Sequence, residues 1–334
     1  MDVALYIRDF VDDPVKPMYQ QIEDAAEIVR KASKWGFMGI YTPQHWVGHP
    51  TVWMQPIPML ARLAPEAVGL KLITGVMLLP MQNPVNLAEQ IITLDHISNG
   101  QFILGAGVGY RETELEAAGT TRRDRAQRFE ECLTLMKLLW SGEEVNFAGQ
   151  FWQVHNARVA ITPLQKPHPP VWIAAQSRRA ARRAAVMADA CLLGPQPSWE
   201  DIRYLSRMYW DAVEANGTQS SSMLGAHRSI AIAKDRETAI RQANAAAEGK
   251  AGMYGNWAMQ EGTTVDLGLT RGRDLAEWAI VGSPQDCAET ITKCYEEQGL
   301  RYLGLGHLNL PKDHNARLEH LQFISEELLP LLPG

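Results

Sequence analysis

His45 is the residue whose type and position best suit proton transfer. It follows Phe37–Tyr41, an apolar run of strand length, and it lies between Gln44 and Trp46. A histidine ring exchanges protons near neutral pH, so a place just beyond a strand suits an acid–base role. A histidine whose hydrogen bonds are satisfied within a loop explains the residue equally well. His49 is close by, but two histidines without neighbouring carboxylates do not make a metal site, and we expect no metal.

Ser177 and Arg178 are a second candidate site, for an anion. They directly follow Val171–Ala175, an expected strand, and open an expected helix that ends at Met187. The free amides of a helix start, a hydroxyl and a guanidinium together can bind a phosphate group. The alternative is an N-capping serine followed by a solvated basic helix face, and the residue types alone favour that plainer explanation.

Glycines at positions 105, 107 and 109 end another apolar run and are a third candidate, because backbone without Cβ atoms can approach a ligand closely. The pattern is not that of a dinucleotide-binding fold, since Tyr110-Arg111 stands where the third glycine of that motif would be. The sequence also has no Walker A loop and no nucleophile elbow of the G-x-S-x-G kind.

The elements that must position these residues alternate between strand and helix along the whole chain. Leu70–Leu79 and Gln101–Ala106 are almost continuously apolar, which is typical of strands buried on both faces of a parallel sheet. The expected strands number eight: Val3–Ile7, Phe37–Tyr41, Leu70–Leu79, Gln101–Ala106, Val171–Ala175, Ala188–Leu193, Arg228–Ala233 and Arg301–Leu308. Eight β/α units predict a TIM (β/α)8 barrel. We expect one domain over residues 1–334, with insertions at about 142–170 (containing a hairpin) and 249–281.

Composition limits the classes of protein to consider. The 334 residues are 46% hydrophobic and 21% charged, which suits a large buried core and argues against disorder. A net charge of −6 argues against a nucleic-acid surface. The four cysteines contain no CxxC pair, so we expect buried thiols in a reducing compartment. No apolar run reaches transmembrane length and the first residues lack a signal-peptide pattern, so we expect a cytoplasmic protein without membrane contact.

A set of ordered motifs resembles the bacterial luciferase-like family of flavin-dependent oxidoreductases. The motifs are Leu94–Tyr110, Glu114 with Gly119, the helix Arg125–Trp140 ending in LLWSGEEVNF, and Pro169–Ser177. The resemblance runs from the first expected strand to the last helix, and it is the ordered set that is specific. It implies a TIM barrel whose pocket binds reduced FMN or, in one branch of the family, the deazaflavin coenzyme F-420.

The resemblance also implies roles for single residues. His45 matches the family's active-site histidine, and the residue before it, often acidic in relatives, is Gln44 here. Thr74, Gly75 and Val76 match the strand end beneath the flavin ring, where relatives often have a cis peptide; the Gly75–Val76 bond is the candidate. The other implied cofactor contacts are Gly107, Val108, Gly109 and Tyr110 beside the ring, and Ala175, Gln176, Ser177 and Arg178 at the phosphate. Relatives usually have glycines at positions 175 and 176.

The function implied by the resemblance is that of a two-component monooxygenase. A separate flavin reductase would deliver reduced FMN, and O2 would oxidise a small apolar organic substrate, with His45 as acid–base. Trp46, Trp53, Trp152 and the 249–281 segment, as a lid, would shape the substrate site, and relatives suggest a homodimer. Three alternatives stay open: F-420-dependent hydride transfer on the same fold, a non-catalytic flavin-binding protein, and a metal-dependent barrel hydrolase, for which the expected strand ends offer no clustered His and Asp.

Overall fold

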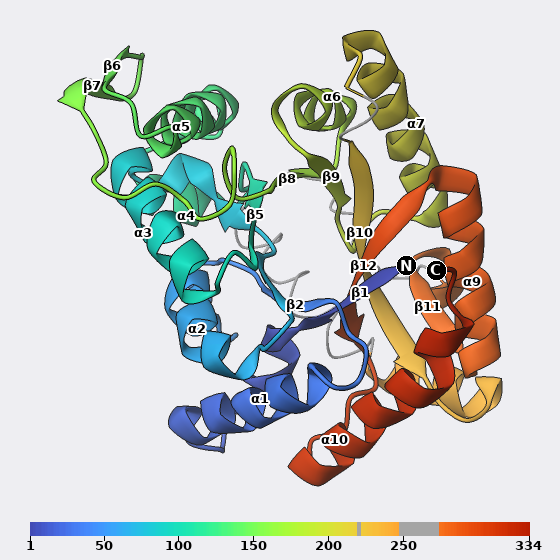
Figure 1. The fold of residues 1–334 in the computed structure, drawn as a ribbon. Coiled ribbons are helices and arrows are strands. Elements are labelled where there is room, and N and C mark those ends of the chain that lie inside the picture. Colours follow the sequence, from blue (N-terminus) through green and yellow to red (C-terminus); the bar gives the residue numbers. More distant parts are fainter. Residues whose placement is uncertain (219–221, 247–273) are drawn as a thin grey trace. The chain divides into compact units, whose positions relative to one another are not determined.

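The computed structural model shows a parallel β/α barrel and describes residues 1–218, 222–246 and 274–334 (Figure 1). The sheet order is β11-β10-β12-β1-β2-β3-β5-β8-β9, with β4 beside β5 and a further pairing of β10 with β9 that closes the ring. The predicted TIM barrel is therefore confirmed. Its strands are β1 (Asp2–Tyr6), β2 (Gly39–Thr42), β3 (Lys71–Thr74), β4 (Met77–Leu78), β5 (Phe102–Gly107), β8 (Val171–Ala175), β9 (Ala190–Leu193), β10 (Met223–Ile232), β11 (Ala279–Gly282) and β12 (Leu300–His307).

Helices follow the strands at the places where the sequence carries start and stop signals. Ser198 and Ser283 each close a capping box at a helix start, and Gly217 and Gly299 end those helices at φ +67° and +72°. The helices are α1 (Met18–Ala32), α2 (Pro56–Leu63), α3 (Pro84–Ile97), α4 (Glu112–Ala117), α5 (Arg125–Trp140), α6 (Arg178–Met187), α7 (Trp199–Asn216), a helix whose described part is 236–246, α9 (Pro284–Gln298) and α10 (His314–Phe323). None of the helices in the described ranges is long and apolar enough to cross a membrane.

The chain divides into two compact units, each made of several segments. Unit 1 contains Met1–Tyr41, Glu66–Leu70 and Ile173–Gly334, and unit 2 contains Thr42–Pro65 and Lys71–Trp172. The single domain expected for residues 1–334 stays a prediction. All four cysteines are buried and form no disulfide: Cys132 is in unit 2, and Cys191, Cys287 and Cys294 are in unit 1.

Aromatic rings occupy the interior of unit 1 where β12 has no side chain. The Tyr41 and His227 rings stack with centroids 4.1 Å apart. A Cβ on Gly304 of β12 would lie 2.4 Å from His227 Cδ2 and 2.8 Å from Tyr41 Cε1. Glycine at 304 is therefore required by the two rings that β2 and β10 bring together.

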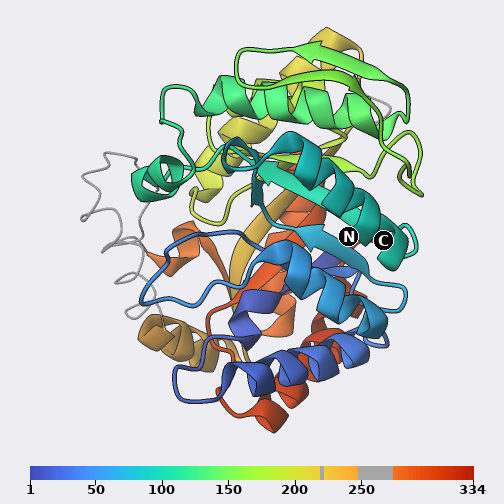
Figure 2. The ribbon, with the colours of Figure 1, turned by 90° about the vertical axis from the view of Figure 1, so that its left-hand side faces the viewer.

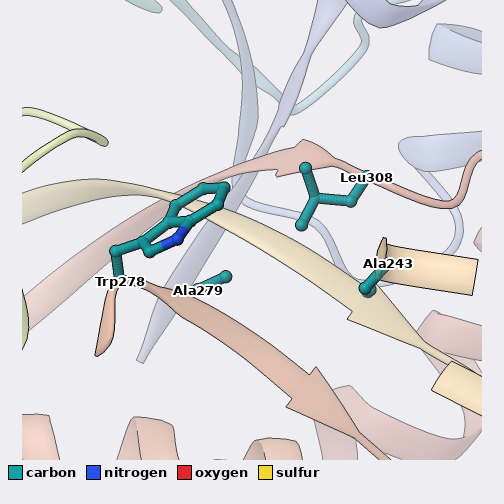
Figure 3. Packing of buried hydrophobic residues seen from close by; sticks show 5 residues of the cluster. Ala243, Trp278, Ala279 and Leu308 are labelled. Carbon is teal, nitrogen blue, oxygen red and sulfur yellow. The ribbon is translucent and has the colours of Figure 1, made fainter. Parts of the chain in front are cut away.

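The predicted insertion at 249–281 is wrong at its carboxyl end. Ala279–Gly282 is a strand, β11, which runs parallel to β10 with Ser229 opposite Ala279. It packs into a buried cluster of Ala231, Ala243, Trp278, Ala279 and Leu308, of which the last four are labelled in Figure 3. A strand of only four residues is too short to show a hydrophobic period, so only its pairing in the sheet reveals it. Residues 247–273, and the lid expected there, lie outside the described residues.

Unit 2 contains the predicted hairpin, β6 (Val145–Ala148) and β7 (Gln153–Ala157), which pair antiparallel beside α5 (Figures 1 and 2). One carboxylate of α5 fixes its turn. The Glu131 side chain accepts hydrogen bonds from the backbone amides of Gln150, Phe151 and Trp152 at 2.8–2.9 Å. The predicted insertion at about 142–170 is thereby attached to the helix that precedes it.

Two other predicted strands have different limits. Leu70–Leu79 was expected as one strand, but it is two, β3 and β4, interrupted at Gly75–Val76. The strand expected at Arg228–Ala233 is β10, which begins five residues earlier, at Met223. Its first half pairs with β9 from Met223 to Ala226, a contact that no local pattern announces.

Candidate active site

His45 lies in the loop after β2 and contacts a buried carboxylate of α4. Its Nδ1 is 2.7 Å from Glu114 Oε1, and the two side chains are 12% and 1% exposed. The residue before His45 is Gln44, which carries no charge, but a carboxylate reaches the ring from 69 residues later. Glu114 and Leu115 are the buried residues of α4, so the Glu114 carboxylate lies on the covered side of this short helix.

Three donors converge on a single oxygen of Glu114. Besides His45, Oε1 accepts from the Trp46 amide at 2.9 Å and from Arg111 Nη1 at 3.2 Å. The same Nη1 donates to the Trp46 carbonyl at 2.8 Å, so Arg111 holds both the carboxylate and the loop. An oxygen that already accepts from two N–H groups acts as an acceptor toward the ring as well. Nδ1 of His45 therefore carries the proton, and Nε2 is left as the nitrogen that can accept one.

Aromatic rings surround His45 on two sides. The Trp53 ring lies edge-on with its centroid at 4.4 Å, and the Tyr110 ring lies edge-on at 5.9 Å. Trp53 approaches so closely because position 48 has no side chain: a Cβ on Gly48 would lie 2.1 Å from Trp53 Cδ1. The apolar rings restrict the orientation of the imidazole and reduce its contact with water.

The peptide between Gly75 and Val76, the candidate bond named from the family resemblance, is cis. The backbone on either side is held by the loop that carries His45: Gly75 N donates to Thr42 O at 2.7 Å, and Gln44 N donates to Val76 O at 3.2 Å. The Gln44 side chain is only 5% exposed, and its Oε1 accepts from Leu78 N at 2.9 Å. Gln44 therefore acts as a brace between the two segments.

Neighbouring strands explain two of the three glycines. A Cβ on Gly105 would lie 1.9 Å from Thr74 O, and one on Gly107 would lie 2.6 Å from Val76 Cγ2. Gly109 has a φ of +72°, which favours glycine, and its carbonyl accepts from Arg125 Nη1 at 2.6 Å. These glycines let the strand and the turn after it pack closely against Thr74–Val76. Val108, Gly109 and Tyr110 are half-buried.

The predicted phosphate loop lies in unit 1. Ala175 is buried, whereas Gln176, Ser177 and Arg178 are exposed. Ser177 caps α6, with its Oγ accepting from Ala180 N at 3.3 Å, and the first turn of α6 holds no acidic residue. The first amides of a helix have no partner within it, so they remain donors beside a hydroxyl and a guanidinium. This donor set fits a phosphate monoester.

The structure therefore brings part of the predicted site together. His45, Thr74–Val76 and Gly107–Tyr110 form one connected network within unit 2, while 175–178 form a separate loop within unit 1. Trp152 was expected to help shape the substrate site. In the structure its ring packs on the Arg128 guanidinium, with Cζ 4.5 Å from the ring centroid, on the hairpin side of α5. Within the described ranges, no group of three or more His, Cys, Asp or Glu residues could hold a metal ion.

Comparison with known proteins identifies the family. The family model described as luciferase-like monooxygenase matches residues 1–302. The chain belongs to the luciferase-like monooxygenase family. Membership indicates an oxidoreductase.

Two relatives of this luciferase-like chain differ in how far they match. An uncharacterised protein of Sinorhizobium fredii is 26% identical over 90% of this chain and 89% of its own length. The oxygenase component of the flavin-dependent trigonelline monooxygenase of Acinetobacter baylyi is 31% identical, over 47% of this chain and 44% of its own length.

Solved structures share the fold of this luciferase-like chain. The FMN-bound oxygenating constituent of 3,6-diketocamphane monooxygenase from Pseudomonas putida superposes with a TM-score of 0.80 at 19% identity, over 100% of this chain and 99% of that one. Coenzyme F420-dependent tetrahydromethanopterin reductase from Methanopyrus kandleri superposes with a TM-score of 0.73 at 16% identity, over 100% and 99% of the two chains. The same barrel is thus found in one protein described with FMN and in another described with coenzyme F420.

Sequence reasoning missed the partners of His45. Glu114 was recognised as part of a motif and Arg111 only as a residue that breaks the dinucleotide pattern, and neither was assigned to the site. The i,i+3 spacing of Arg111 and Glu114 was the available signal, since such residues lie on one side of a helix turn.

Proposed function

We propose that this protein is the oxygenase of a two-component flavin-dependent monooxygenase, using reduced FMN and O2 to oxidise a small apolar organic substrate. Family membership and the flavin-dependent relative support the reaction class. The observation that carries the proposal is the His45–Glu114 pair, which gives the site an imidazole of fixed tautomer among aromatic rings. A separate reductase supplies the reduced flavin in this proposal, and the active form is a homodimer.

The predicted segments have different parts in this proposal. The Thr74–Val76 and Gly107–Tyr110 segments contact the flavin ring, and Ser177, Arg178 and the first amides of α6 bind its phosphate. Reduced FMN, when bound, supplies the two electrons with which one atom of O2 enters the substrate and the other leaves as water. His45 Nε2 accepts and returns a proton, while Glu114 holds Nδ1–H in place and Trp53 limits the access of water.

A cofactor titration tests the proposal. The apoprotein is titrated with FMN, reduced FMN, FAD, riboflavin and F-420, with its tryptophan fluorescence as the signal. We expect reduced FMN to bind at micromolar concentration or below and riboflavin to bind more weakly, because riboflavin lacks the phosphate. Oxygen uptake with reduced FMN is then screened against small apolar compounds. Binding of F-420 without binding of FMN would replace the monooxygenase with a hydride-transfer enzyme.

A further inference from the structure

A small cavity lies inside unit 1, where β10, β11 and β12 meet α7 and α9. Its volume is about 10 Å³. Most of its wall consists of apolar side chains that are at most 3% exposed: Ile202, Ala226, Ile280, Ile291, Leu300 and Leu303. Two strongly polar residues, Arg228 and Gln298, also line it, together with the thiol of Cys294. The cavity therefore presents two hydrogen-bonding side chains within an apolar surround.

Arg228 of β10 is a buried cation that has an enclosed donor at this cavity. The residue is 1% exposed, and burial lowers the pKa of its guanidinium to about 10, so it stays charged near neutral pH. Its Nη1 donates to the Pro197 carbonyl at 2.8 Å, and its Nη2 donates to the Trp278 carbonyl. Its Cζ lies 4.1 Å from the centroid of the Trp199 ring. The Nε–H group is enclosed and has no hydrogen-bond partner among the described residues.

Gln298, the last residue of α9, contributes an enclosed acceptor. The residue is 7% exposed, and in the part of the chain that the structure describes its Oε1 has no hydrogen-bond partner. Its backbone is held without the help of the side chain, because Trp210 Nε1 donates to the Gln298 carbonyl at 2.8 Å. A polar group enclosed without a hydrogen bond destabilises the folded state, so a partner from outside the chain is favoured at both groups.

The chemistry of these two groups defines what the cavity can bind. Arg228 Nε only donates, and Gln298 Oε1 only accepts. A ligand between them must accept from the first and donate to the second, which excludes chloride and other simple anions because they have no hydrogen to donate. A volume of about 10–15 Å³ is the least that one water molecule needs, so the cavity admits a single heavy atom. The Cys294 thiol offers a further, weak contact.

We propose that this cavity is a binding site for a single water molecule, which accepts a hydrogen bond from Arg228 Nε and donates one to Gln298 Oε1. The water links β10 to the end of α9 and completes the hydrogen bonds of a buried cation. Neither a flavin nor a substrate takes part, so the site is independent of the proposed function.

Crystal structures of the unaltered protein and of Gln298→Met, at a resolution that shows ordered water, test this site. The unaltered protein should show one density peak in the cavity, within about 2.7–3.2 Å of both Arg228 Nε and Gln298 Oε1. Methionine is flexible and fills a similar space, but its sulfur is only a weak acceptor, so the peak should be lost. Gln285→Met, at an exposed position of α9, is the matched control and should keep the peak.

Oxygen-17 magnetic relaxation dispersion makes the same comparison in solution. The number of long-lived internal waters should fall by one in Gln298→Met and stay unchanged in Gln285→Met. If Gln298→Met fails to fold, the crystal structure of the unaltered protein decides alone, through the presence or absence of the peak at the two atoms.

Three results would overturn the assignment. The first is a dry cavity in the unaltered protein, and the second is an unchanged number of internal waters in a folded Gln298→Met. The third is an anomalous signal in the cavity of crystals soaked in bromide. That signal would mean that the Gln298 amide turns its Nε2 inward and that the site holds an anion.

Discussion

Replacing Glu114 by Gln removes one negative charge from the site while keeping its shape. The Trp46 amide and Arg111 both donate to Oε1, so they hold the oxygen of the new amide in the same place. His45 Nδ1–H then meets a neutral acceptor in place of a carboxylate. A hydrogen bond to a charged group contributes about 1.5–3 kcal/mol and a neutral one about 0.5–1.5 kcal/mol. The difference between the middles of these ranges, about 1.2 kcal/mol, corresponds to about an eightfold weaker preference for the Nδ1–H tautomer.

The substitution also removes a negative charge that a buried arginine contacts. The Arg111 side chain is 6% exposed and pairs with a Glu114 side chain that is 1% exposed. Removing one partner of such a buried pair is expected to lower the free energy of unfolding by about 3–5 kcal/mol. Glu116→Gln is the matched control, because Glu116 is on the same helix but exposed, and it should change neither the tautomer nor the stability.

The direct assay is NMR of protein labelled with 15N-histidine, with His45→Ala used to assign the signal of His45. The unaltered protein should show His45 protonated at Nδ1, and Glu114→Gln should show a mixture of tautomers. Urea denaturation of the two variants measures the accompanying loss of stability. A spectrum in which the unaltered protein carries the proton at Nε2 would refute the assignment of donor and acceptor, whatever the effect on activity.

Three further perturbations follow from the structure. His45→Ala should leave the Kd of reduced FMN within twofold and slow turnover about 10²- to 10⁴-fold, as measured by oxygen-coupled product formation, because the ring transfers a proton and does not bind the cofactor. Replacing Ser177 and Arg178 by Ala should weaken FMN at least tenfold more than riboflavin in a fluorescence titration, because the lost contacts are to the phosphate. Burial lowers the pKa of His227 to about 3, so the folded state keeps this ring neutral. Its contribution to stability should therefore fall by about 2 kcal/mol between pH 6.5 and pH 5, since the unfolded chain alone gains a proton there. Urea denaturation of the unaltered protein and of His227→Phe at both pH values measures this.

Each of these has an outcome that contradicts it. Unchanged turnover in His45→Ala would make the histidine structural, and equal loss of both flavins in the double variant would move the phosphate elsewhere. For His227, the stability advantage of the unaltered protein over His227→Phe should shrink as the pH falls. An advantage that is constant from pH 6.5 to pH 5 would mean that the ring is protonated in the folded state.

The sequence determined the architecture and the positions of most site segments. Continuous apolar runs such as Gln101–Ala106 predict buried parallel strands, and capping residues such as Ser283 mark helix starts, because both signals arise from interactions between near neighbours in the chain. The family motifs likewise placed the cis peptide at Gly75–Val76, as the structure shows.

Only the tertiary structure decided which distant residues meet. Glu114 reaches His45 across 69 positions, Arg228 donates to the Pro197 carbonyl 31 positions earlier, and β11 is a strand because β10 lies beside it. No period or local composition encodes these contacts, since each depends on how separate β/α units are brought together by the closed sheet. For that reason the sequence around His45 identified the histidine but not Glu114, the partner that sets its tautomer.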